Sequence, residues 1–311
     1  MSRNLLGIRH ISAEDLRDLL ALGTEFKRRV LQREPLPRVR EETVGLLFFE
    51  DSTRTRVSFE QAAKYLGMNT VSFTGRGSSM SKGESLKDTI LTLRHERLTT
   101  VVMRHRMPGS AQLAARYFPG PVLNAGDGEH EHPAQALGDA LTILERKGHL
   151  DGLIVAIVGD VEHSRVARSN AWLLSKLGAE VRFVGPKTML PSHTAMLPGS
   201  VHYTLETGIH NADVVMCLRL QKERMLDGLL SSVGEYARMY QVTRQSLEYA
   251  SPDCLVMHPG PLNRGIELDD DAADGDCSVI NDQVENGIFV RMAAYWWALD
   301  RTMDDLKKVA A

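Results

Sequence analysis

Short apolar runs alternate with segments of helical periodicity along almost the whole chain. Strands that alternate with helices pair in parallel, because each helical connection crosses over the sheet before the next strand begins. The pattern therefore predicts an α/β fold of parallel sheets flanked by helices. Helices are predicted to begin near Ser12, Thr53, Ser85, Ser110 and Pro133. The predicted strands are 43–49, 70–73, 99–103, 122–124, 153–160, 180–184, 213–218 and 254–258.

A polar segment with glycines, 146–152, interrupts this alternation near the middle of the chain. Such a segment between two apolar stretches is typical of a linker, and 311 residues suffice for two domains at about 100 to 200 residues each. We expect one domain over 1–146 and another over 147–280. Apolar residues recur at helical spacing in 281–311, which predicts a final helix, about 281–308, with one buried face.

The composition excludes several classes of protein. Lys and Arg number 37 and Asp and Glu 40, a net charge of −3 that argues against nucleic acid or a membrane surface as a partner. Three cysteines without a C-x-x-C pair predict neither a disulfide framework nor a structural zinc site, and a reducing cytoplasm fits them best. No apolar leader and no apolar stretch of membrane-spanning length is evident, so we expect a cytoplasmic protein.

The first polar cluster follows the strand predicted at 43–49. Ser52, Thr53, Arg54 and Thr55 stand where a helix should begin, so hydroxyl and guanidinium groups join the unpaired amides of a helix N-terminus. This combination suits a phosphate dianion. The alternative is a simple helix cap with solvated arginines. A nucleotide-binding P-loop is excluded, because the G-x-x-x-x-G-K pattern is absent.

Further polar clusters follow other predicted strands, and ligands of parallel α/β sheets bind beyond the carboxyl ends of strands. Arg104 lies in a basic segment at the end of the strand predicted over 99–103, and His132 and Gln135 lie where a helix is predicted to begin. We expect them to converge with the first cluster. The Gly- and Ser-rich segment 75–88 carries Lys82, although by itself it is typical of a plain surface loop.

A metal site at Asp127, His130 and His132 is disfavoured, because no further ligand stands at a zinc-like spacing. We therefore predict no metal and no cofactor. Nicotinamide binding is also disfavoured, because the turn at Gly159 lacks the G-x-G-x-x-G spacing. The acidic segment 267–276 departs from a calcium loop at two ligand positions, and we interpret it as a solvated loop.

In the second half, polar residues again follow predicted strands. Arg165 and Arg219 carry guanidinium groups, which can bind small carboxylates with bidentate hydrogen bonds. A single arginine after a strand, however, is usually only a surface residue. Gln221 lies two residues after Arg219, and the segment Pro259, Gly260 and Pro261 follows the last predicted strand.

Taken together, the motifs resemble the aspartate carbamoyltransferase family, within the wider aspartate/ornithine carbamoyltransferase superfamily. They occur in the family's order, and the C-terminal QVENGIFVRMA is also similar. The resemblance implies a carbamoyl-phosphate domain, an aspartate domain, and a final helix that returns to the first domain. The motifs are FFEDSTRTRVSFE, SKGESLKDT, VVMRH, NAGDGEHEHPAQALGD, VGDVEHSR, LRLQKER and HPGPLNR.

The resemblance also implies roles for the singled-out residues. Arg54, Thr55, Lys82, Arg104 and His132 are expected to be catalytic. Aspartate is expected to contact Lys82, Arg165, Arg219 and Gln221. The resemblance also implies that Ser78 and Lys82 lie in a loop that enters the active site of a neighbouring subunit. The residues expected to contact carbamoyl phosphate are Ser52, Thr53, Arg54, Thr55, Arg104, His132, Gln135, Pro259, Gly260 and Pro261.

The implied reaction transfers the carbamoyl group of carbamoyl phosphate to L-aspartate, an early step of pyrimidine synthesis, in a homotrimer with shared active sites. The resemblance leaves open whether a regulatory chain or a dihydroorotase is a further partner. The alternatives are an ornithine or other amino-acid carbamoyltransferase and a non-catalytic anion-binding homologue. Aspartate is favoured over ornithine, because the chain has H-P-G-P and two arginines where ornithine enzymes typically carry H-C-L-P and acidic residues.

Overall fold

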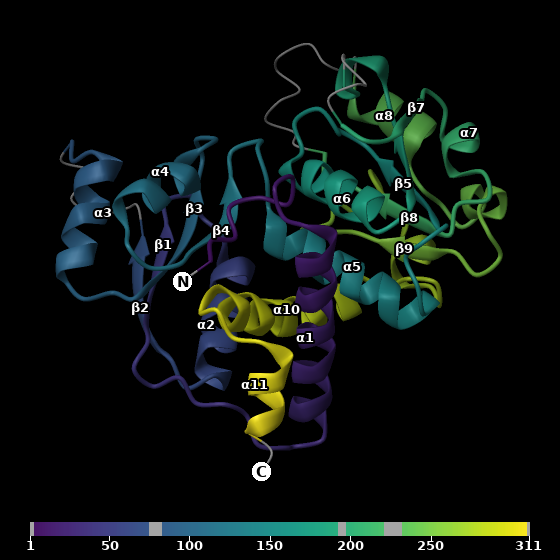
Figure 1. Ribbon diagram of the computed structural model, residues 1–311. Helices are drawn as coiled ribbons and strands as arrows, with labels where there is room; N and C mark the ends of the chain where they lie inside the picture. The colour runs from purple at the N-terminus through teal and green to yellow at the C-terminus, as the bar shows by residue number, and fades with distance from the viewer. Residues whose placement is uncertain (1–2, 75–82, 192–196, 221–231, 310–311) are drawn as a thin grey trace. The chain divides into compact units, whose positions relative to one another are not determined.

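The computed structural model describes residues 3–74, 83–191, 197–220 and 232–309. The chain divides into two compact units (Figure 1). The first unit comprises Met1–Leu141 and Glu285–Ala311, and the second comprises Thr142–Val284. The bounds of both units therefore fall inside helices, because α5 (Pro133–Lys147) and α10 (Ile280–Ala298) each contribute to both.

The first unit contains a parallel sheet in the order β2-β1-β3-β4. On one face of this sheet, apolar residues of β1, β3 and β4 pack with Ile90 and Leu93 of α3 and with Ala111 and Ala114 of α4. The remaining elements of the unit are α1, α2, the first part of α5, most of α10, and α11 (Met303–Lys308). Its elements before α5 are α1 (Ala13–Leu31), β1 (Thr43–Phe48), α2 (Thr53–Tyr65), β2 (Asn69–Thr74), α3 (Leu86–His95), β3 (Thr100–His105), α4 (Ser110–Tyr117) and β4 (Val122–Asp127).

The second unit contains a parallel sheet in the order β7-β6-β5-β8-β9. Its core is formed by small and β-branched side chains of the strands, such as Ala156, Val215 and Val256, together with Ile209 of α7. Its strands are β5 (Ile154–Val158), β6 (Glu180–Val184), β7 (Ser200–His202), β8 (Val214–Cys217) and β9 (Leu255–Met257). Its helical elements are α6 (Arg165–Lys176), η2 (Lys187–Met189), α7 (Leu205–Ile209), α8 (Val233–Tyr240), η5 (Ser246–Tyr249) and α9 (Asp270–Asp274).

The predicted α/β class, with parallel sheets and flanking helices, is confirmed. Local signals account for several element ends. The Ser12 side chain accepts a hydrogen bond from the Asp15 amide at 3.0 Å and caps α1, as its sequence position predicts. Two glycines with positive φ, Gly148 and Gly152, lie between α5 and β5, where glycine adopts a left-handed backbone without strain.

The C-terminal helix packs on the first unit, as the family resemblance implies. The Tyr295 hydroxyl donates to the Phe59 carbonyl at 3.3 Å, and the Trp296 ring lies edge-on to Phe26 at 6.2 Å between centroids. Figure 1 shows α1, α10 and α11 close together. These contacts join the end of the chain to α1 and α2, near its beginning.

Two predictions about this end of the chain are corrected. The helix predicted over 281–308 is divided into α10 and α11 (Met303–Lys308). Asp300 has φ of 61°, a left-handed conformation that cannot continue an α-helix, and a capping box of Thr302 and Asp305 starts α11. The single buried face is also wrong in part: Val284 is 56% exposed, whereas successive residues such as Tyr295, Trp296 and Trp297 are all buried.

The interpretation of 267–276 as a solvated loop is wrong in part, although Asp270, Asp271, Asp274 and Asp276 are exposed. Glu267 and Leu268 are buried, and residues Asp270–Asp274 form the short helix α9, which is capped by the Asp269 side chain. Acidic composition alone indicates solvation, but one carboxylate of this segment finds buried hydrogen-bond donors. None of the described helices is both long and apolar enough to cross a bilayer.

Candidate active site

The phosphate-binding cluster predicted at Ser52–Thr55 forms the N-terminus of α2. Ser52 occupies the N-cap position, but its side chain makes no capping hydrogen bond, and the first turn carries no acidic residue. Thr53 and Arg54 are exposed, whereas Thr55 is buried. A helix N-terminus presents amide groups and the positive end of the helix dipole, so this end of α2 has the composition of an anion site.

Arg104 lies on β3, the strand that pairs with β1, which leads into this cluster. In the parallel pairing of β1 with β3, Phe48 is opposite Arg104, and the Phe49 amide donates to the Arg104 carbonyl at 2.9 Å. The guanidinium is buried and donates to a Glu50 carboxylate oxygen at 2.6 Å and to the Ala125 carbonyl at 3.1 Å. Sequence reasoning missed Glu50, although an acidic residue between an apolar strand and a basic cluster is the signal for such a partner.

His132 is buried immediately before α5. Its carbonyl accepts a hydrogen bond from the Gln135 amide at 3.0 Å, which closes the first turn of the helix. The Gln135 side-chain amide donates to Asp139 at 2.8 Å. Both residues are therefore held by the beginning of α5, where the sequence predicted them.

Asp127 is fully buried at the end of β4 and organises the loop before His132. It accepts hydrogen bonds from the Gly109 amide at 2.8 Å and from the Asn124 side chain at 2.7 Å, and it lies 3.1 Å from His130 Nδ1. The Asp127 carboxylate oxygens therefore hold the surrounding loops together through hydrogen bonds. Among the residues that the structure describes, no group of three or more His, Cys, Asp or Glu side chains is placed to hold a metal ion.

Glu131 is a further buried residue that sequence reasoning missed. Its carboxylate accepts hydrogen bonds from the backbone amides of Ile8, at 2.6 Å, and Arg9, at 3.2 Å. It thereby ties the N-terminal segment to the residue next to His132. No local sequence signal announces a contact across more than 120 positions.

His105, in the basic cluster with Arg104, is not a plausible cation. Burial lowers its pKa, and the neighbouring Arg106 lowers the pKa further. Its Nδ1 accepts a hydrogen bond from the Met107 amide at 2.9 Å, which matches a neutral ring. The positive charge in this cluster therefore belongs to the arginines.

In the second unit, three of the sequence-predicted segments follow the neighbouring strands β5, β8 and β9. Arg165 is half-buried at the first position of α6, where Ser164 caps the helix by accepting from the Ala167 amide. Arg219 is exposed, two residues after the end of β8. Gln221, Ser78 and Lys82 lie outside the described residues.

The segment Pro259, Gly260 and Pro261 follows β9. Gly260 has φ of 66°, and its amide donates to His258 Nδ1 at 2.8 Å, so the loop turns back on the end of the strand. The peptide between Gly260 and Pro261 is cis. A left-handed backbone at this position favours glycine over residues with a side chain.

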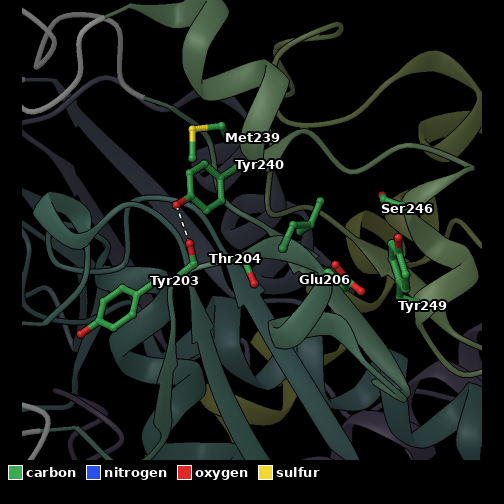
Figure 2. A pocket seen from close by; sticks show the side chains of 8 residues that line it. Tyr203, Thr204, Glu206, Met239, Tyr240, Ser246 and Tyr249 are labelled. Atoms are coloured by element: carbon green, nitrogen blue, oxygen red, sulfur yellow. Dashed lines mark hydrogen bonds between the residues drawn. The ribbon is translucent and has the colours of Figure 1, made fainter.

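A cavity of about 330 Å³ lies elsewhere in the second unit (Figure 2). The Tyr240 hydroxyl donates to the Tyr203 carbonyl at 2.7 Å, and burial raises the pKa of Tyr240. This cavity contains none of the residues predicted for the site. Its lining residues are Tyr203, Thr204, Leu205, Glu206, Met239, Tyr240, Ser246 and Tyr249.

Known proteins match both halves of the chain. The family model of the aspartate/ornithine carbamoyltransferase carbamoyl-P binding domain matches residues 3–145, and that of the Asp/Orn binding domain matches residues 151–298. The chain is 48% identical to the aspartate carbamoyltransferase catalytic subunit of Pelotomaculum thermopropionicum over 94% of its own length and 95% of the relative's. It is 50% identical to that of Gluconacetobacter diazotrophicus, over 94% and 91% of the two chains.

Solved structures agree with the sequence matches. The ornithine carbamoyltransferase from Pyrococcus furiosus superposes with a TM-score of 0.87 at 27% identity, covering 96% of this chain and 97% of that one. The aspartate transcarbamoylase from Trypanosoma cruzi in complex with N-(phosphonacetyl)-L-aspartic acid gives 0.85 at 32% identity, covering 95% of each chain. With both domain models matched in order, the chain belongs to the aspartate/ornithine carbamoyltransferase family.

Proposed function

We propose that this chain is the catalytic subunit of an aspartate carbamoyltransferase, which converts carbamoyl phosphate and L-aspartate into N-carbamoyl-L-aspartate and phosphate. The observation that carries the proposal is the position of Arg104 opposite Phe48, the last residue of β1, so that it lies at the end of the strand that leads into the N-terminus of α2. A fixed cation beside an anion-binding helix end suits a phosphorylated substrate. The names of the bacterial relatives support aspartate as the acceptor.

In the proposed site, Ser52, Thr53, Arg54 and Thr55 bind the phosphate group at the N-terminus of α2. Arg104 and His132 contact the carbamoyl oxygen, with help from Thr55, and Gln135 contacts the carbamoyl amide. The main-chain carbonyls of the segment 259–261 accept from the carbamoyl and amino groups. Arg165, Arg219 and Gln221 bind the two carboxylates of aspartate.

The chemistry needs no covalent enzyme intermediate. The neutral amine of aspartate attacks the carbamoyl carbon, a C–N bond forms, and the tetrahedral intermediate then breaks its C–O bond to expel phosphate, which takes the amine proton. Hydrogen-bond donors at Thr55, Arg104 and His132 stabilise the oxygen that becomes negative, at a few kcal/mol for each well-placed donor. The substrates together bring about four negative charges, which fixed cations on the protein offset.

The direct test is turnover. The purified protein, treated with a chelator, should form carbamoyl-aspartate and release phosphate in equal amounts from carbamoyl phosphate and L-aspartate. Substantially faster turnover with L-ornithine would overturn the assignment of the acceptor. Absence of turnover with either amino acid, despite binding of carbamoyl phosphate, would indicate a non-catalytic homologue.

Ornithine carbamoyltransferase stands as the second candidate, because the enzyme from Pyrococcus furiosus has a closely similar fold. The positions of Arg165 and Arg219 after neighbouring strands argue for aspartate. Aspartate has a side-chain carboxylate that a second guanidinium group can bind. The same two guanidinium groups would repel the side-chain ammonium of ornithine.

We further propose a cytoplasmic homotrimer in which Ser78 and Lys82 complete the active site of a neighbouring subunit, with the product entering pyrimidine synthesis. Lys82→Ala and Arg54→Ala proteins should each be nearly inactive and should regain part of the activity when their subunits are mixed, since a hybrid contains one intact composite site. Absence of recovery despite proven subunit exchange would place Lys82 in the site of its own chain. Sedimentation would establish the trimer, and co-purification would test for a regulatory chain or a dihydroorotase.

A further inference from the structure

Glu267 is a buried carboxylate that joins two loops of the second unit. One of its oxygens accepts a hydrogen bond from the Leu220 amide at 2.7 Å, and the other accepts from the Asn263 amide at 2.8 Å. The Asn263 side chain adds a cross-link, because its Nδ2 donates both to Glu267 at 2.7 Å and to the Leu220 carbonyl at 3.2 Å. Leu220 and Glu267 are each 1% exposed, so the bond between them is buried, and the bonds to Asn263 are partly buried.

Each loop carries a residue of the proposed site next to its point of attachment. Leu220 directly follows Arg219, and Asn263 lies two residues beyond Pro261. The attachment points lie outside helices and strands, so sheet or helix bonds do not fix them. An unpaired buried amide costs about 1–3 kcal/mol, and the carboxylate removes that cost at both loops. The relative position of the two loops therefore depends on Glu267, with the Asn263 side chain as a second link.

Glu267 is itself held firmly. The Val242 amide donates to the Glu267 carbonyl at 2.9 Å, and the neighbouring Leu268 is fully buried. His258 Nδ1 accepts from the Gly260 amide, so the proton of a neutral ring stands on Nε2, which lies 3.9 Å from the Glu267 carboxylate. Burial raises the pKa of Glu267, and hydrogen bonds from Asn263 and Leu220 oppose that rise.

We propose that Glu267 is a positioning residue for aspartate binding: through the main chain, it sets the place of Arg219 relative to the loop 259–261. This inference rests on the proposed function, in which Arg219 binds a carboxylate of aspartate and the loop contacts the carbamoyl group. Glu267 is not a catalytic residue, because both of its carboxylate oxygens serve the protein's own amide groups. Its loss should therefore weaken aspartate binding.

The test is Glu267→Gln. An amide side chain has one acceptor oxygen, so its NH₂ group must face a backbone donor, and one loop is released. We expect the KM for aspartate to rise at least tenfold, while the affinity for carbamoyl phosphate alone, measured by calorimetry, changes less than threefold. The control is Asp269→Asn, two residues further along the chain, which weakens the cap of α9 but contacts neither loop and should leave the KM within twofold.

Two further variants keep the test decisive where Glu267→Gln does not fold. Asn263→Ala removes only the side-chain cross-link and should raise the KM for aspartate about threefold. Glu267→Asp should lose less than Glu267→Gln, because it keeps two acceptor oxygens. Folded Glu267→Gln or Asn263→Ala protein with the wild-type KM would overturn the role of Glu267. Wild-type protein that fails to carbamoylate aspartate would instead overturn the proposed function.

Discussion

The two units hold their proposed site residues in different ways. In the first unit these residues lie at ends of regular elements: Arg54 and Thr55 begin α2, Arg104 is the next-to-last residue of β3, and His132 directly precedes α5. In the second unit Arg165 likewise begins a helix, α6, but Arg219 and the segment 259–261 lie in irregular loops that Glu267 connects.

This difference has an energetic origin. Helix ends and strand ends are placed by hydrogen bonds of the whole element, so a side chain there is fixed once the sheet forms. Irregular loops need separate partners for their buried amides, and a single carboxylate supplies them for two loops in the second unit. We therefore expect substitutions in the first unit to affect the chemical step, and those near Glu267 to affect aspartate binding.

The largest effect is expected for Arg104→Ala, which should lower kcat about 100- to 1000-fold by removing a donor to the developing negative oxygen. It also leaves Glu50 without its guanidinium partner. Steady-state kinetics measure the change, with the exposed Arg106→Ala as the control from the same cluster. If Arg104→Ala instead raised only the KM for aspartate and left kcat unchanged, the proposed difference between the two units would be wrong.

Glu131→Gln sharpens the comparison, because Glu131 ties two segments of the first unit as Glu267 does in the second. One of the Ile8 and Arg9 amides would lose its acceptor, so we expect stability to fall by about 2 kcal/mol. The KM for aspartate should stay within twofold. Denaturant unfolding and kinetics provide the two readouts, with the exposed Glu96→Gln as the control. A tenfold rise in the KM for aspartate would show that Glu131 affects aspartate binding as Glu267 is proposed to do, and would contradict the difference between the units.

A smaller effect is expected for Gly260→Ala. The φ of 66° at Gly260 costs about 1 kcal/mol for a residue with a side chain, and relief of that strain would move the loop 259–261. Gly265→Ala is the matched control, because Gly265 has φ of 78° in the same connection and open space around it. Both variants should lose similar stability, but only Gly260→Ala should raise KM values. Equal kinetics in both would show that the loop tolerates displacement.

The smallest effect is expected at Glu25, on α1, where hydrogen bonds first from Arg28 and then from Arg29 hold the pKa of the carboxyl at about 2. A depressed pKa stabilises the folded state above the unfolded pKa, and this contribution declines as pH falls from about 4.5 towards 2. Glu25→Gln should therefore cost about 1 kcal/mol at neutral pH and less at about pH 3.5. Melting temperatures at the two pH values measure this, and kcat should not change. A stability difference that grows on acidification would contradict it.

Much of the fold follows from local patterns. The alternation of apolar runs and helical periodicity predicted two parallel sheets, and Ser12 marked the start of α1. The positions of the proposed site residues at helix and strand ends were predictable for the same reason. The division of the final helix was not predicted, because no glycine or proline stands where it divides, although the capping box of Thr302 and Asp305 is a local signal for a new helix.

Sequence by itself determined the class of fold and the polar residues that follow the strands, because periodicity and end signals act between near neighbours. Only the tertiary structure decided how deeply each carboxylate is buried, from the half-buried Glu50 to the buried Glu131 and Glu267, and which groups it binds. Glu50 pairs with Arg104 across 54 positions, Glu131 reaches Ile8 across 123, and Glu267 reaches Leu220 across 47. An acidic residue at the surface and one that fastens two loops look alike in a sequence, since the difference is the donor that folding brings within 3 Å.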